Sequence, residues 1–196
     1  MKALKIFLGI SLVAMLTSCW DMEDCYYREN YYETGNRPTN GSGTAGFIYD
    51  GLAYITMRSW FGRPAYDYVR LRSDDSRDSL KIGMDRFASV DRKKSFEFVG
   101  LNFPADSLKE GVTLDETDVG VVITRRTTKA NSAMLHFVKV DKVNCVVVAE
   151  WSIEGDFFFK DEVYHYALTD GYLDMKVEPE CLAEKLRPGW GTGEYE

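Results

Sequence analysis

The chain has little of what several classes of protein need. It has 24 Lys and Arg against 31 Asp and Glu, a formal net charge of -7, so it lacks the surplus of basic residues with which proteins contact nucleic-acid phosphates. It has only two histidines, His136 and His165, and no CxxC pair, so we expect neither a metal nor another cofactor. No nucleophile elbow, zinc-protease motif or Gly-rich phosphate loop occurs in the sequence. We therefore predict a protein that is not an enzyme and does not bind nucleic acid.

The chain also lacks an apolar run long enough to cross a membrane as a helix. Its longest such run, residues 6–16, follows Lys2 and Lys5 and is shorter than the ~20 residues that a membrane-spanning helix requires. A charged start followed by a short apolar run is typical of a secretory signal peptide, which we place at residues 1–18.

The signal ends in Leu16-Thr17-Ser18-Cys19, with an apolar residue three places before a cysteine and small residues between them. This run resembles the lipobox of bacterial lipoproteins. The resemblance implies cleavage before Cys19 and attachment of lipid, including palmitate, to its thiol. Several acyl chains, at about 0.8 kcal/mol per buried methylene, would anchor the mature protein to a membrane. The alternative is a cysteine buried at the end of a short apolar helix.

Acidic residues follow the cysteine directly, at Asp21, Glu23 and Asp24. They resemble the surface-export signal of Bacteroidetes outer-membrane lipoproteins, which implies a place on the cell surface. The alternative is an ordinary solvated linker in a lipoprotein that faces the periplasm. Residues 19–43 have no sustained apolar period, so we expect a flexible tether there.

From Thr44 the pattern changes to short apolar runs of period two. We expect an all-β domain over residues 44–178, with about ten antiparallel strands in hairpin and meander order. The first strands are expected at residues 45–49, 52–57, 66–71, 80–84 and 96–101, and others follow from Val119. Both a barrel and a sandwich fit this number of strands.

Turn dipeptides predict where hairpins form. Asp50-Gly51 and Asp170-Gly171 are typical of type I′ turns, and Gly155-Asp156 suits a type II′ turn. Short polar connections are expected at Lys129-Ala130-Asn131 and at Asp141-Lys142.

The end of the domain carries two further expectations. Alternating apolar residues predict one long strand over residues 143–154, in the middle of the sheet. Pro179 followed by residues 180–186 predicts a short helix in the terminal segment 179–196. Residues 149–178 resemble the ends of small Bacteroidetes lipoprotein domains of unknown function, some of them lipocalin-like. That resemblance implies a barrel or sandwich on a lipid anchor and brings no catalytic residues with it.

Exposed aromatic residues are the candidate ligand contacts. Trp60, Phe61 and Tyr66 flank Gly and Pro in an expected loop, where rings could stack on sugars or anchor a partner protein. The alternative is that the rings fold back and plug one end of the domain. A second group, at residues 157–159, must place one ring on the opposite face from its neighbours, so part of that hairpin needs a cover or a partner.

Four cysteines leave three beside Cys19. In an oxidising compartment Cys145 could pair with Cys181, or Cys25 with Cys181, and at least one thiol stays free. Carboxylate pairs such as Asp74-Asp75, Asp115-Glu116 and Asp161-Glu162 are expected in solvated turns, although a hydrolase would need two such acids across a cleft.

Two serines stand in Asp-Ser-Leu triplets, Ser79 and Ser107. The triplets resemble the acceptor pattern of general O-glycosylation in Bacteroidetes, and Ser107 in its loop is the favoured acceptor. The function most consistent with the sequence is a lipid-anchored lipoprotein whose β domain binds a glycan, a small apolar ligand or an envelope protein. The alternatives are an accessory subunit without a ligand pocket and, further off, a hydrolase.

Overall fold

The computed structural model describes residues 37–56, 69–73, 78–90, 93–124, 126–159 and 162–177. All of them lie in one compact unit, Tyr31–Glu196. They form ten strands of a single antiparallel sheet and one short 3-10 helix, η2 (Ala105–Ser107). The all-β prediction is therefore confirmed. The helix expected after Pro179 lies outside the described residues.

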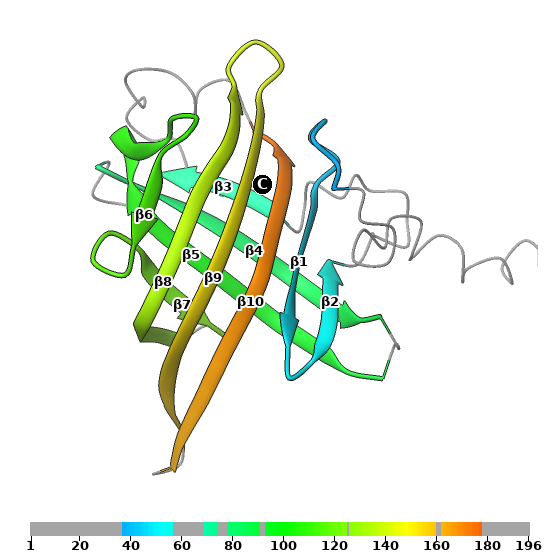
Figure 1. Ribbon diagram of the computed structural model, residues 1–196, viewed down its shortest axis with the longest axis vertical. Coiled ribbons are helices and arrows are strands. Elements are labelled where there is room, and N and C mark those ends of the chain that lie inside the picture. Colours follow the sequence, from blue (N-terminus) through cyan, green and yellow to red (C-terminus); the bar gives the residue numbers. More distant parts are fainter. Residues whose placement is uncertain are drawn as a thin grey trace, which may run out of the picture. The chain divides into compact units, whose positions relative to one another are not determined.

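The strands are β1 (Thr44–Tyr49), β2 (Leu52–Thr56), β3 (Val69–Ser73), β4 (Ser79–Ser89), β5 (Ser95–Pro104), β6 (Thr113–Asp115), β7 (Gly120–Ile123), β8 (Arg126–Asp141), β9 (Val146–Phe159) and β10 (Glu162–Lys176). The three longest strands, β8, β9 and β10, follow one another along the chain and lie side by side (Figure 1). The order of the strands in the sheet is β2-β1-β10-β9-β8-β7-β5-β4-β3, and β6 pairs with β8. The meander expected after Val119 is β7 to β10.

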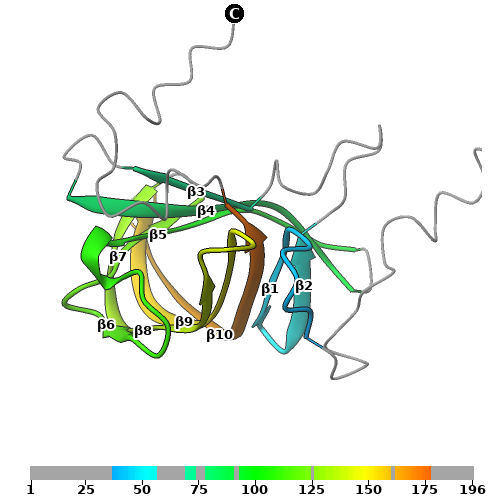
Figure 2. The same cartoon turned by 90° about the horizontal axis from the view of Figure 1, so that it is seen from above.

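The sheet curls around its core, so that β4 and β5 face β8, β9 and β10 (Figure 2). At one end of the sheet β2 also pairs with β4, where Tyr54, Ile55 and Thr56 lie opposite Ser89, Ala88 and Phe87. This seam is short, because the rest of the same edge of β4 pairs with β3. The sheet is therefore not closed into a barrel along its length, and all strands belong to one sheet rather than to the two sheets of a sandwich.

Alternation along each strand directs one set of side chains into the core. The largest of the fully buried side chains are Trp151, Tyr166, Phe47, Phe87, Phe103 and Phe137. Phe47 contacts the rings of Phe87 and Trp151, with centroids 4.7 and 5.6 Å away. The Phe103 ring, on β5, lies 5.2 Å from the Phe137 ring, on β8. Burial of these rings is the main contribution to the stability of the domain.

The alternation changes phase once within β4. Leu80, Ile82 and Met84 are buried, and the next buried residue is Phe87 rather than residue 86. Arg86 has a φ of 56°, a left-handed conformation that rotates the strand and restores an inward direction one residue later. Residue spacing alone cannot place such a switch.

Of the five expected connections between strands, two are confirmed and three are wrong. Asp50 and Gly51 join β1 to β2 with φ angles of 51° and 71°, as a type I′ turn requires. Gly155-Asp156 instead lies inside β9, Asp170-Gly171 inside β10, and Lys129-Ala130-Asn131 inside β8. The polar connection at Asp141-Lys142 is confirmed as the β8–β9 turn.

Close packing and bulges explain these continuous strands. At Asp170-Gly171 the β9–β10 register shifts between Leu168 and Gly171, so the dipeptide forms a bulge instead of a turn. Asp170 has a φ of 49°, but Gly171 packs against the Trp151 ring, where a Cβ atom would lie 2.2 Å from Cδ2. Glycine here permits a close approach of two strands. From the sequence alone, the same glycine is expected to form a turn.

Candidate functional site

The residues expected to carry a function fall in two groups. Cys19, Cys25, Trp60, Phe61 and Tyr66 lie outside the described residues, so lipidation and the aromatic contact stay predictions. Ser79, Ser107, Cys145, the Asp115-Glu116 pair and the two histidines lie on or beside the sheet.

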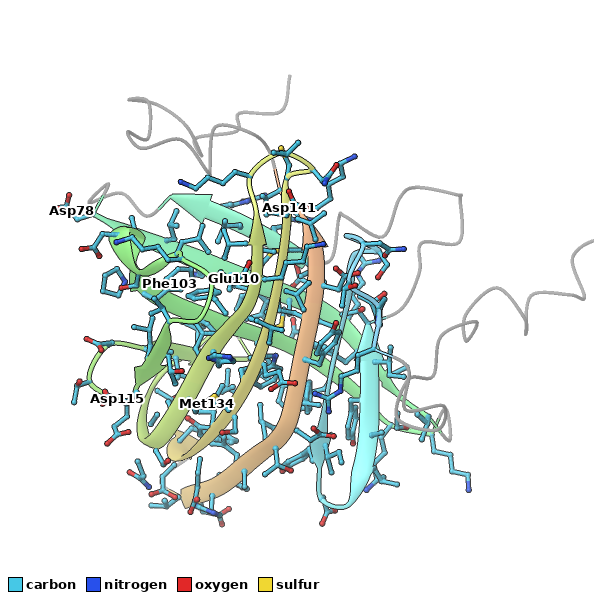
Figure 3. The ribbon with its side chains drawn as sticks, turned by 45° about the horizontal axis from the view of Figure 1, so that its top comes forward. Asp78, Phe103, Glu110, Asp115, Met134 and Asp141 are labelled. Carbon is cyan, nitrogen blue, oxygen red and sulfur yellow. The ribbon has the colours of Figure 1, made fainter. Side chains whose placement is uncertain are left out.

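Ser79 and Ser107 lie near each other at one end of the sheet. Ser79 begins β4 opposite Pro104, and Ser107 ends η2, which follows Pro104 directly. The Ala105 amide donates to the Asp78 carbonyl oxygen at 2.9 Å, which joins the two segments. The leucine after each serine is buried and both serines are half-buried. The fold therefore brings the two Asp-Ser-Leu triplets together, with Asp78 at the margin of the sheet (Figure 3).

Cys145 lies in the turn between β8 and β9 and forms no disulfide bond with another described residue. Its carbonyl oxygen accepts a 2.8 Å hydrogen bond from the amide of Val177, the last described residue. Cys181 follows four residues later, a distance of at most ~14 Å in an extended chain. The Cys145–Cys181 pairing is therefore sterically reachable, and it stays a prediction because Cys181 lies outside the described residues.

The carboxylate pair Asp115-Glu116 lies where β6 ends and a turn exposed to solvent begins. The side chain of Asp115 accepts hydrogen bonds from the hydroxyl of Thr117 at 2.6 Å and from its amide at 2.9 Å. These bonds hold the pKa of Asp115 below its usual range, because they stabilise the ionised form. This carboxylate therefore stabilises the turn. Asp74, Asp75 and Asp161 lie outside the described residues.

The two histidines have separate polar partners. The Nδ1 atom of His136 lies 2.8 Å from the Thr113 hydroxyl. His165 lies 3.1 Å from Asp156 through Nδ1 and 3.6 Å from Glu154 through Nε2. Hydrogen bonds from Asn131 and then from His165 lower the pKa of Asp156. Within the part of the chain that the structure describes, no three His, Cys, Asp or Glu side chains are grouped to hold a metal ion.

A polar site that sequence reasoning missed lies on the outer face of β9 and β10. We call residues 37–43, which lead into β1 (blue in Figure 1), the strap. The Asp174 side chain is fully buried beneath it. This carboxylate accepts hydrogen bonds from the amides of Gly41 and Ser42, each at 2.7 Å, and from the Ser42 hydroxyl at 2.8 Å. A buried carboxylate with three donors is well compensated for its loss of water.

The start of the strap has a second set of contacts. The Arg37 guanidinium forms ion pairs with Glu150, at 2.9 Å, and with Asp170. It also lies over the Tyr172 ring, 5.2 Å from the centroid, and the Tyr172 hydroxyl donates to the Pro38 carbonyl oxygen. Burial, and then the charge of Asp174, raise the pKa of Tyr172 above its usual value. The strap thus contacts the sheet at both of its ends.

These contacts correct the extent of the expected tether. The sequence predicts a flexible tether that includes residues 37–43 because they have no sustained apolar period, yet they are hydrogen-bonded to the sheet. A cluster of three residues on the outer face, Val146, Val148 and Tyr172, is buried beside them. The remainder of the expected tether lies outside the described residues.

The β9–β10 hairpin extends beyond its neighbours. β8 pairs with β9 only as far as Asp156, and β1 pairs with β10 only from Thr169 onward. In this extension the Phe157 ring stacks on the Tyr164 ring, with centroids 5.3 Å apart. Tyr164 is 40% exposed, and its hydroxyl donates to Glu162 at 2.5 Å. The expected aromatic hairpin therefore carries an exposed ring, that of Tyr164, which the core does not enclose.

Comparison with known proteins adds no family. No model of a protein family matches the chain, and neither a curated protein nor a solved structure is similar to it. Among the described residues, no helix has the length and apolar character to cross a membrane.

Proposed function

We propose that this chain is a lipid-anchored lipoprotein of the outer membrane, displayed on the cell surface, whose β domain binds a glycan or an envelope protein and catalyses no reaction. The lipobox at Cys19 and the acidic residues after it support the anchor and its location. The β domain that follows supplies the outer surface and loops through which we expect binding to occur.

The observation that carries the mode of binding is the filled interior of the sheet. A curled sheet of about eight strands either fills its interior with side chains or encloses one small ligand. Here six large rings and their aliphatic neighbours are buried inside, including Trp151, Phe47 and Phe137. Contact through the outer surface or the loops therefore suits this domain better than an internal apolar ligand would.

The anchor is tested with Cys19→Ala, and Cys145→Ala is the matched control because it also removes one thiol. We expect wild type and Cys145→Ala to incorporate labelled palmitate and to sediment with membranes, and Cys19→Ala to lose both properties. Palmitate on the Cys19→Ala protein would refute the lipobox.

Location and binding are tested together on intact cells. A surface protein is digested by added protease, and cross-linking followed by mass spectrometry identifies what it contacts. Digestion together with a bound glycan or protein would support the proposal. Protection from protease, with no contact found, would favour the accessory subunit on the periplasmic side.

A further inference from the structure

We infer that the strap is a docked clasp that fixes the point at which the N-terminal segment leaves the β domain. Docking follows from contacts in the described residues alone. Its consequence for the membrane rests on the proposed lipidation of Cys19.

The first argument is the chemistry beneath the strap. The Asp174 carboxylate is fully buried and accepts three hydrogen bonds, one from Gly41 and two from Ser42. If the strap were to leave, it would remove these three hydrogen bonds. The adjacent main chain is bonded as well, since the Gly43 amide donates to the Asp174 carbonyl oxygen at 2.9 Å. Docking therefore satisfies a group whose burial alone would be costly.

The second argument is that the strap is held at separated points. Arg37 bonds to carboxylates on both β9 and β10, and the Thr39 carbonyl oxygen accepts a 3.2 Å hydrogen bond from Lys139 of β8. Three adjacent strands therefore contact one short segment. A linker without specific contacts would not match charges and hydrogen bonds at each of these positions.

The third argument is steric. Gly41 has a φ of +80°, and a Cβ atom there would lie 3.1 Å from Cγ2 of Val146 and 3.2 Å from Cβ of Lys176. The strap approaches the sheet closely enough that a side chain would press on two strands. Glycine at this position provides both the left-handed backbone and the close approach.

The clasp limits how an anchored domain is held. With the strap docked, the stretch between Cys19 and the strap is residues 19–36, whose fully extended length is at most about 60 Å at ~3.4 Å per residue. Without docking the corresponding stretch would be residues 19–43, or at most about 85 Å. The docked strap also makes this segment depart from the outer face of β9 and β10. Docking thereby shortens the greatest distance that can separate a lipidated Cys19 from the domain.

Hydrogen exchange of the full chain in detergent micelles tests the clasp. We expect the amides of Gly41, Ser42 and Gly43 to exchange at least tenfold more slowly than unstructured amides, and Gly41→Ala to remove this protection. Gly111→Ala is the matched control, because Gly111 also has a φ of +80° but a Cβ atom added there would have no neighbour within 4 Å. It should leave exchange in the strap unchanged.

Fast exchange of these amides in the wild type would overturn the inference, as would full protection in Gly41→Ala. If Gly41→Ala exchanges fast throughout the sheet, it has failed to fold, and Arg37→Ala then decides. Arg37→Ala should speed exchange in the strap at least threefold, and no change would overturn the clasp. Cys19→Ala separates the two proposals: strap protection in that variant supports docking, whatever the palmitate assay shows.

Discussion

Replacement of Gly171 by alanine tests the most consequential difference between the sequence reading and the structure. The added Cβ would lie 2.2 Å from Cδ2 of Trp151 and 2.4 Å from the carbonyl oxygen of that residue, far inside the ~3.5–4.0 Å of a carbon contact. Trp151 is only 1% exposed and packs against Phe47 on the core side. Neither the ring nor the β9 backbone can move away without disturbing well-packed neighbours.

The expected cost of Gly171→Ala follows from that geometry. Overpacking a core typically costs ~1–3 kcal/mol, and the clash with the backbone places this variant at or above the upper end, about 3 kcal/mol or more. If Gly171 were instead in a type I′ turn, alanine would lower the free energy of unfolding only by the ~1–2 kcal/mol that a left-handed backbone costs a residue with a Cβ atom. The size of the effect therefore distinguishes the two structures.

Urea unfolding followed by far-UV circular dichroism measures the difference. With a slope of ~2 kcal/mol per molar urea, the midpoint of Gly171→Ala should fall by about 1.5 M. Gly120→Ala is the control, because a Cβ atom at that position would have no atom nearer than 3.4 Å. This variant should match or exceed wild-type stability. A loss of about 2 kcal/mol or less in Gly171→Ala, the range expected for a turn glycine, would refute the packing argument.

Two further predictions follow from single residues. The raised pKa of Tyr172 means that the folded state holds this proton more tightly than the unfolded state does, so the associated stability is complete below about pH 10 and falls as the pH rises above it. Tyr172→Phe should therefore lose less stability than wild type between pH 9 and 11 in urea unfolding. An equal loss in both proteins would mean that a group other than Tyr172 causes the pH dependence. For the cysteines, peptide mapping of unreduced mature protein should find Cys145 linked to Cys181, and a Cys25–Cys181 peptide would contradict this pairing.

The first half of the fold was largely predictable because its signals are local. Asp50-Gly51 supplies two left-handed residues between two apolar runs, and β1 and β2 form on either side of it. β4 and β5 were also located, but both extend beyond their expected ranges. β6, only three residues long, was missed because so short a strand has no detectable period.

The second half was divided too finely because glycine and aspartate have two uses in sheets. Gly155-Asp156 lies opposite Tyr166 and His165 of β10 within a regular ladder, and Asp170-Gly171 forms a bulge. In both places the dipeptide has the composition of a turn. What keeps each strand continuous is pairing and packing with a neighbouring strand, which local sequence does not contain.

The strap could not be predicted for a related reason. Arg37 bonds to residues more than a hundred positions away, and no local pattern connects them. In β10, Asp170 and Asp174 alternate with buried apolar residues and read as members of a solvated face, yet one forms an ion pair with the strap and the other is buried beneath it. An alternating strand reports which residues share a face but not whether that face meets water. On this sheet the composition of residues 37–43 predicted a linker, whereas the buried carboxylate they satisfy makes them part of the domain.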